Sequence, residues 1–257
     1  MSNTAVAYTG MPPTLWAPPA PQLIKNARMI IIGYQADPDA LAAVLPPGLT
    51  PHPNNMIQMN MYTLPADQSS GLGDFSLTYL TVEVAGHDSF AADGAVAIPG
   101  RFFAYYWNSS PRMLTYVRES AGIPAMYGAR RGDIHDGILT SVLTVEGRDV
   151  ITARASVTDT PAGALGGHLN YFAHRQIPRP EGGQAALSEL IELPLPFVLD
   201  MYEATVQDIT FDFPEGHPAA ALAPVQPLQI GALLYADVTF TYSMGRTIKN
   251  YLQEPGA

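Results

Sequence analysis

Hydrophobic and polar residues alternate along much of this chain, and a period of two residues predicts a fold made mostly of strands. The clearest run is 74–85, where Phe75, Leu77 and Tyr79 fall on one face and Ser76 and Thr78 on the other. We expect further strands at 28–36, 56–63, 100–107, 138–145, 150–157, 169–173, 205–213 and 231–242. The Glu146-Gly147 step between two of these runs is typical of a β-hairpin turn.

Two segments instead carry helix signals. Asp37 and Pro38 are suited to the N-cap and first turn of a short helix that ends at Leu45, before Pro46-Pro47-Gly48. Ser110 and Pro111 start a second helix, whose apolar stripe ends before Gly122 and consists of Met113, Leu114, Val117 and Ala121. Strands with two or three short helices predict an α+β, mainly β domain with a curved or barrel-like sheet.

The first residues differ from the rest, because residues 9–21 contain five prolines. Such a segment cannot continue a helix or a central strand. We therefore divide the chain into a proline-rich N-terminal arm, residues 1–24, which Trp16 is expected to dock, and a single domain, residues 25–257.

Charge is scarce and negative. The net charge is -10, and only 14% of residues are charged, against about 25% in an average protein. An acidic chain without clustered Lys and Arg is not suited to nucleic acid. Apolar runs such as Met29–Ile32 are far shorter than a membrane span of roughly 18 residues. The N-terminus lacks a secretory signal, so a cytoplasmic protein is expected, and the scarcity of charge favours a homo-oligomer.

Several chemistries have no support in the residue inventory. There is no cysteine, no phosphate-binding glycine loop and no Gly-x-Ser-x-Gly elbow. The six histidines lack metal-binding spacing, so neither a metal nor a cofactor is expected. Residues 133–136, Asp-Ile-His-Asp, are interpreted as a solvated turn rather than an ion site. His168 and His174 fall on one strand face, either as structural histidines or as a pocket acid or base.

The segment Gly100–Gly128 resembles the core of the acetoacetate decarboxylase family, in which a strand leads into a helix ending Gly-Arg-Glu and then into a Lys-Lys pair. The resemblance extends over nearly the whole chain through short matching pieces, namely Tyr34 with Asp37, Asp39-Ala-Leu, Leu45-Pro46, residues 70–73, Asn170-Tyr171, Ala236-Asp237 and Tyr251-Leu252. It implies a double-layered, cone-like β-barrel in an oligomer, which binds small oxo-acids inside. In the family the first lysine forms an imine with the substrate, and its neighbour lowers its pKa.

This chain departs from the family at those positions. The lysine pair aligns with Ala125 and Met126, and two pocket glutamates align with Leu77 and Asn60. The arginine of the first strand aligns one residue away from Arg28, and such a slip turns a side chain to the opposite face. Arg118 and Glu119 are kept in register. We therefore predict against acetoacetate decarboxylation by the imine route.

A less charged cavity suits an apolar or aromatic ligand. The resemblance and the aromatic strands together give a substrate pocket of Asn60, Tyr62, Leu77, Tyr79, Trp107, Ala125 and Met126, with Tyr106 as a further lining residue. The candidate catalytic residues are Arg118, Glu119, Tyr105 and His174. The alternative interpretation is that the tyrosines and the tryptophan are ordinary core aromatics.

Three functions follow. The first is an enzyme that works without a Schiff base, as a lyase, dehydratase, cyclase or isomerase on a hydrophobic keto-containing metabolite. The second is a binding protein on the same barrel that does not turn its ligand over. The third retains imine chemistry through Lys25 or Lys249, the two lysines of the chain.

Overall fold

A computed structural model describes residues 21–92, 94 and 97–253. The first twenty residues of the predicted arm, Trp16 included, lie outside that part. The strands are β1 (Gln22–Gln35), β2 (Met56–Leu64), β3 (Phe75–Phe90), β4 (Ala97–Asn108), β5 (Ala125–Tyr127), β6 (Ala129–His135), β7 (Ile138–Val145), β8 (Arg148–Pro178), β9 (Ala185–Phe211), β10 (Ile230–Tyr242) and β11 (Arg246–Asn250). The helices are α1 (Pro38–Val44) and α2 (Pro111–Ala121), with short 3₁₀ turns η2 (Ala66–Gln68) and η3 (Pro218–Leu222).

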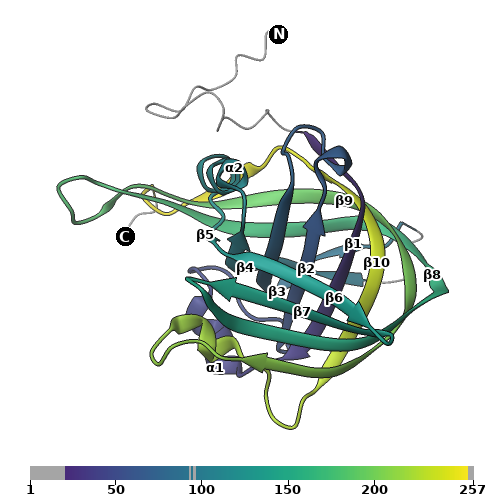
Figure 1. Ribbon diagram of the computed structural model, residues 1–257. Coiled ribbons are helices and arrows are strands. Elements are labelled where there is room, and N and C mark those ends of the chain that lie inside the picture. The colour runs from purple at the N-terminus through teal and green to yellow at the C-terminus, as the bar shows by residue number, and fades with distance from the viewer. Residues whose placement is uncertain (1–20, 93, 95–96, 254–257) are drawn as a thin grey trace.

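The strands form one mixed sheet whose pairing closes into a ring. The neighbours run β9-β10-β1-β2-β3-β4-β8, and β8 pairs with β9 again, while β7, β6, β5 and β11 extend from this ring. Figure 1 shows the long β8 and β9 wrapping the molecule, with α2 and α1 at opposite ends. The predicted mainly β fold with few helices is confirmed.

Alternation along β1–β4 separates the apolar side chains into two main clusters. One, which we call the α2 cluster, takes side chains from all seven strands of the ring and from α2. The other, the α1 cluster, lies on the opposite face of β1–β4 and packs against α1 and η3. Both clusters take side chains from all seven strands of the ring, and the face of β1–β4 toward the α2 cluster is called the interior face below.

Both helices begin where the sequence predicts. The Asp37 carboxylate accepts hydrogen bonds from the backbone N–H groups of Asp39 and Ala40, and the Ser110 hydroxyl accepts from Met113. Gly122 ends α2 in the left-handed conformation at φ 69°, which glycine adopts at little cost. These caps fix α2 immediately before β5.

Every expected strand overlaps a strand of the structure, but β5, β6, β11 and the first part of β9 were not expected. Runs expected separately at 150–157 and 169–173 belong to one strand, β8, and the run at 205–213 is the end of β9. Register shifts around Pro161 and Gly163 absorb the residues that suggested loops. The predicted Glu146-Gly147 turn joins β7 to β8. The solvated turn expected at 133–136 is shorter than predicted, because residues 133–135 belong to β6 and Asp136-Gly137 makes the connection to β7, with His135 and Asp136 exposed. No helix in the described part of the chain has the length and apolar character that a membrane crossing requires.

Candidate functional site

The interior face of the sheet carries a row of residues that crosses five strands. Ala125 on β5 is the register partner of Tyr106, which is paired with Tyr79, which is paired with Asn60, and Asn60 lies opposite Ile31 on β1. Side chains in such a row are about 5 Å apart at their Cβ atoms. The row therefore places Ala125, the position aligned with the family's nucleophile, beside two phenols and an amide.

Tyrosines concentrate around this row. Tyr79 stacks on Tyr106 with 5.8 Å between ring centroids, and its hydroxyl lies 3.2 Å from the hydroxyl of Tyr171 on β8. Phe103 stacks on Tyr171 at 4.7 Å and meets Tyr79 edge-on at 5.4 Å. Tyr62 lies in the same cluster. Ile31 and Tyr79, on either side of Asn60, are each 8% exposed, and Asn60 itself is 1% exposed.

These phenols are neutral hydrogen-bond donors at ordinary pH. Burial raises the pKa of Tyr62, Tyr79 and Tyr106 well above the usual value, and nearby tyrosine hydroxyls raise it further. For Tyr79 the positive charge of Arg101 opposes part of that rise. A phenol that keeps its proton can donate it to a carbonyl oxygen.

Several buried polar atoms on this face have few or no hydrogen-bond partners. The Asn60 Nδ2 and the hydroxyls of Tyr62 and Tyr106 are buried without a hydrogen-bond partner of normal geometry among the described residues, although the Tyr242 hydroxyl contributes to the raised pKa of both tyrosines. Buried polar groups are nearly always paired in folded proteins. The Asn60 amide is therefore an unpaired donor in a cluster that also holds the hydroxyls of Tyr62, Tyr106 and Tyr242, and such a place suits a ligand or water.

Neither lysine belongs to this interior. Lys25 is exposed on β1, and the Lys249 ammonium lies 5.1 Å from the ring centre of Tyr251, outside the α2 cluster. No lysine side chain therefore occupies the interior row. The described residues hold no group of three or more His, Asp or Glu side chains placed to bind a metal.

Five of the predicted pocket residues come together. Asn60, Tyr62, Leu77, Tyr79 and Ala125 share the interior face, and all five are buried. Trp107 lies instead in the α1 cluster, and Met126, next to Ala125, is 36% exposed. Adjacent residues of a strand point to opposite faces, so a run of consecutive aromatics cannot all line one pocket.

The four candidate catalytic residues lie away from the row. Tyr105 stacks on Trp107 on the α1-cluster side. The His174 ring lies between Ser188, whose hydroxyl is 2.9 Å from Nε2, and Tyr251, on the face of β8 opposite to Tyr171 and Ala173. Arg118 and Glu119 are exposed, because α2 turns Met113, Tyr116, Val117 and Ala121 toward the core.

Sequence reasoning missed four residues of the interior, namely Arg101, Phe103, Tyr171 and Tyr242. Each falls within a strand that was predicted, so alternation was an available signal for Tyr171 between Leu169 and Ala173. What was absent from the sequence is the parallel pairing that sets Arg101 against Tyr171 and Phe102 against Phe172, seventy positions along the chain.

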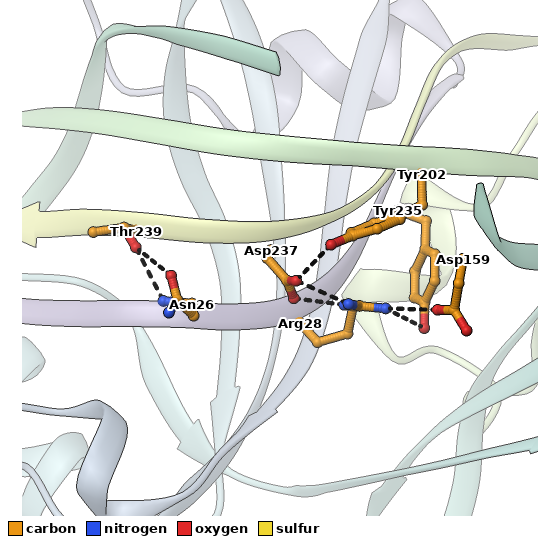
Figure 2. A network of polar contacts seen from close by, with 7 residues as sticks. All are labelled: Asn26, Arg28, Asp159, Tyr202, Tyr235, Asp237 and Thr239. Carbon is orange, nitrogen blue, oxygen red and sulfur yellow. Dashed lines mark hydrogen bonds and ion pairs between the residues drawn. The ribbon is translucent and has the colours of Figure 1, made fainter. Parts of the chain in front are cut away.

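Arg28 faces away from this site, as the one-residue slip predicts. Its neighbours Met29 and Ile31 lie in the α2 cluster, whereas Arg28 lies on the opposite face of β1. Figure 2 shows it in a polar network with Asp237: Nε and Nη2 contact the two carboxylate oxygens at 2.5 and 2.8 Å. The Arg28 guanidinium also lies 4.2 Å from the ring centre of Tyr202 and 5.1 Å from that of Tyr235.

Comparison with known proteins agrees with this architecture. The sequence model of the acetoacetate decarboxylase family matches residues 8–252. No curated protein matches in sequence. A solved structure described as a study of acetoacetate decarboxylase superposes with a TM-score of 0.76 at 17% identity, covering 92% of this chain and 93% of its own.

Two further structures are similar. Acetoacetate decarboxylase from Legionella pneumophila has a TM-score of 0.75 at 18% identity, with 92% of this chain and 90% of that chain covered. The enduracididine biosynthesis enzyme MppR, complexed with the condensation product of pyruvate and imidazole 4-carboxaldehyde, has a TM-score of 0.69 at 18% identity and covers 97% and 99%. Identities this low show a common fold.

Proposed function

Because this chain belongs to the acetoacetate decarboxylase family, we propose that it is a small-molecule enzyme that has lost imine chemistry. Its substrate is a keto-containing, fairly hydrophobic metabolite bound in the interior of the ring. The reaction is of the lyase, dehydratase or cyclase type and proceeds without a Schiff base. Solved relatives include MppR with a pyruvate-derived product, which supports a keto compound as the ligand class.

The observation that carries the proposal is the composition of the interior row. Alanine stands where the resemblance puts the nucleophilic lysine, and Tyr106, Tyr79 and Asn60 continue the row. Both lysines of the chain lie elsewhere, Lys25 exposed and Lys249 against Tyr251. Activation of a bound ketone then has to come from hydrogen-bond donors.

The hydroxyl pair of Tyr79 and Tyr171 is suited to that role. Its two oxygens are 3.2 Å apart, so a carbonyl oxygen placed beside them accepts from one hydroxyl while the other supports it. Preorganised donors in a site of low dielectric stabilise negative charge that develops on oxygen during enolisation or elimination. The pocket thus polarises the carbonyl without a covalent bond.

Borohydride trapping tests the absence of an imine. Protein incubated with acetoacetate and then reduced should show no added mass on Lys25 or Lys249 in peptide maps. A lysine adduct that disappears in Lys25→Arg or Lys249→Arg would show that the protein forms an imine and would contradict the proposal.

Turnover is tested on phenylpyruvate and on any metabolite that co-purifies, by following its mass over time. Tyr79→Phe and Tyr171→Phe should each lower turnover about tenfold or more, because each removes a donor that acts on developing charge. Unchanged rates in both variants would contradict the assigned role of the hydroxyl pair.

A non-catalytic binding protein is the second candidate function. It is favoured by one observation: no carboxylate or imidazole stands in the row from Ala125 to Ile31. Under this alternative the co-purified ligand stays chemically unchanged for as long as it is incubated with the protein, whereas the enzyme converts it.

We further propose that the protein is a homo-oligomer, since its surface exposes large apolar side chains such as Phe90, Tyr127, Val198 and Met244 while carrying little charge. Light scattering of the purified protein gives the subunit number, and a monomeric mass would exclude assembly. The cytoplasmic location and the absence of nucleic-acid and membrane partners remain predictions.

A further inference from the structure

A second polar row lies on the interior face, two rows from Ala125. Arg101 on β4 is the direct register partner of Glu83 on β3 and, on its other side, of Tyr171 on β8. Arg101 precedes Phe103 by two residues and Glu83 follows Tyr79 by four, so both share the interior face with them. A guanidinium and a carboxylate thus begin from neighbouring positions in the sheet.

The two charges nevertheless do not pair. No ion pair joins them among the described residues, and the Arg101 Nε is buried without a hydrogen-bond partner there. Oppositely charged neighbours in a partly buried site attract strongly. Something therefore directs Glu83 away from Arg101.

Two amides engage both oxygens of Glu83. The Gln58 Nε2 donates to Oε1 at 2.7 Å, and the Asn54 Nδ2 donates to Oε2 at 2.5 Å. Glu83 is 4% exposed and is the one charged side chain classed as buried in the described part of the chain. Gly33 makes room for the Gln58 amide, since a Cβ on Gly33 would lie 2.7 Å from Nε2.

Arg101 lies close enough to the tyrosine pair to act on it electrostatically. Its charge lowers the pKa of Tyr79 against the effect of burial, and its register partner Tyr171 holds the hydroxyl that meets Tyr79. The Arg101 N–H groups and two phenol hydroxyls are therefore donors on one side of the interior, with the Glu83 carboxylate occupied by its amides.

We propose that Arg101 is the specificity-determining residue of the interior: its guanidinium, kept free of Glu83 by the Gln58 and Asn54 amides, binds an anionic oxygen group of the ligand. Glu83 is a positioning residue that acts through Arg101. This inference rests on the proposed function and adds a charge requirement to it. The anionic group is a carboxylate next to the keto group, because the N–H groups of a guanidinium match the two oxygens of a carboxylate.

Three matched probes test the contact with Arg101 separately from the proposed function. Phenylpyruvate carries a ketone and a carboxylate, phenylacetone keeps the ketone alone, and 3-phenylpropanoate keeps the carboxylate alone. Dissociation constants are measured by calorimetry on the full chain. The quantity that decides is the ratio of affinities for phenylpyruvate and phenylacetone, because a general loss of folding does not change a ratio.

In the unaltered protein phenylpyruvate should bind about tenfold tighter than phenylacetone or better, as expected for one charge-assisted contact. Arg101→Gln should bring the ratio close to one, while Arg154→Gln, at an exposed arginine on β8, should leave it unchanged. Binding of 3-phenylpropanoate that depends on Arg101 assigns the contact to a carboxylate. Binding of 3-phenylpropanoate that is as tight in Arg101→Gln as in the unaltered protein would overturn the contact.

The role of Glu83 is tested by two substitutions that are expected to change the affinity ratio in opposite directions. Gln58→Leu releases one Glu83 oxygen to compete for Arg101, so the ratio should fall several-fold although Arg101 is intact. Adding Glu83→Gln to that variant removes the competing charge and should restore the ratio. A loss that the second substitution does not reverse would show that Gln58 acts only on folding and would overturn the positioning role.

Equal affinities of the unaltered protein for phenylpyruvate and phenylacetone would overturn the role of Arg101 and leave the proposed function standing. Binding of neither keto compound at millimolar concentration would overturn both.

Discussion

Two arginines of the sheet, Arg28 on β1 and Arg101 on β4, have opposite surroundings. Arg28 has an acidic register partner, Asp237 on β10, and pairs with it through two contacts. Arg101 also has an acidic register partner, Glu83 on β3, yet no ion pair forms between them. Cross-strand register places each arginine opposite a carboxylate, but only Arg28 forms an ion pair with its register partner.

The difference teaches how charge is divided between folding and binding. Around Arg28 the Asp237 carboxylate accepts from the guanidinium and from the Tyr202 hydroxyl at 3.0 Å, so β1, β10 and β9 are joined where the ring closes. Around Arg101 the buried Nε has no hydrogen-bond partner among the described protein groups. A satisfied cluster stabilises the fold, whereas an unsatisfied one is complementary to something that binds.

The largest effect is expected from Arg28→Leu. This substitution leaves the Asp237 carboxylate without its cation and removes contacts with two aromatic rings. The free energy of unfolding should fall by about 2 kcal/mol, because a partly buried bidentate pair contributes less than a fully buried one. Urea unfolding followed by circular dichroism measures the loss.

Asp159→Asn is the matched control, because Asp159 is 94% exposed and its 3.6 Å contact with Arg28 is screened by water. It should leave the unfolding midpoint unchanged. A loss as large as that of Arg28→Leu would show that Asp159, and not Asp237, is the stabilising partner of Arg28.

An acid titration sharpens the comparison next. The hydrogen bonds from Arg28 hold the pKa of Asp237 below its usual value. A carboxyl whose pKa is depressed in the folded state adds stability above its unfolded pKa of about 3.9 and loses it as the pH falls below that value. Asp237→Asn should therefore flatten the decline of the unfolding free energy below about pH 4. A decline as steep as before would assign it to other carboxyls.

The sequence reached part of this picture through local rules. Alternation put Leu77 and Tyr79 on one face, and the N-caps Asp37 and Ser110 placed both helices, because these signals depend on residues close together in the chain. The pocket positions Asn60 and Ala125 came instead from the family resemblance, and they fall in the same row.

The rest depended on geometry that no local pattern contains. β4 pairs Leu80 with Tyr105 and Thr81 with Phe103, so Ala104 is an extra residue, and the bulge shifts the alternation of everything after it. Tyr106 consequently shares a face with Phe103, and Tyr105 and Trp107 turn to the α1 cluster. A strictly alternating β4 would have placed Tyr105 and Trp107 inside, as the predicted site requires.

The smallest effect on stability, and the sharpest contrast, is expected from Arg101→Leu. The same substitution that costs about 2 kcal/mol at Arg28 should change the unfolding free energy by less than about 0.5 kcal/mol here, because the Arg101 Nε gains no hydrogen bond in return for its burial. Leucine keeps an apolar side chain at this position, and Glu83 retains its two amide donors. Both variants should be unfolded in the same urea series, so that the two positions share one reference. If Arg101→Leu destabilises as much as Arg28→Leu, the guanidinium supports the fold and the distinction between the two arginines fails. If its stability is unchanged and the preference for phenylpyruvate is lost, the charge at Arg101 serves binding alone.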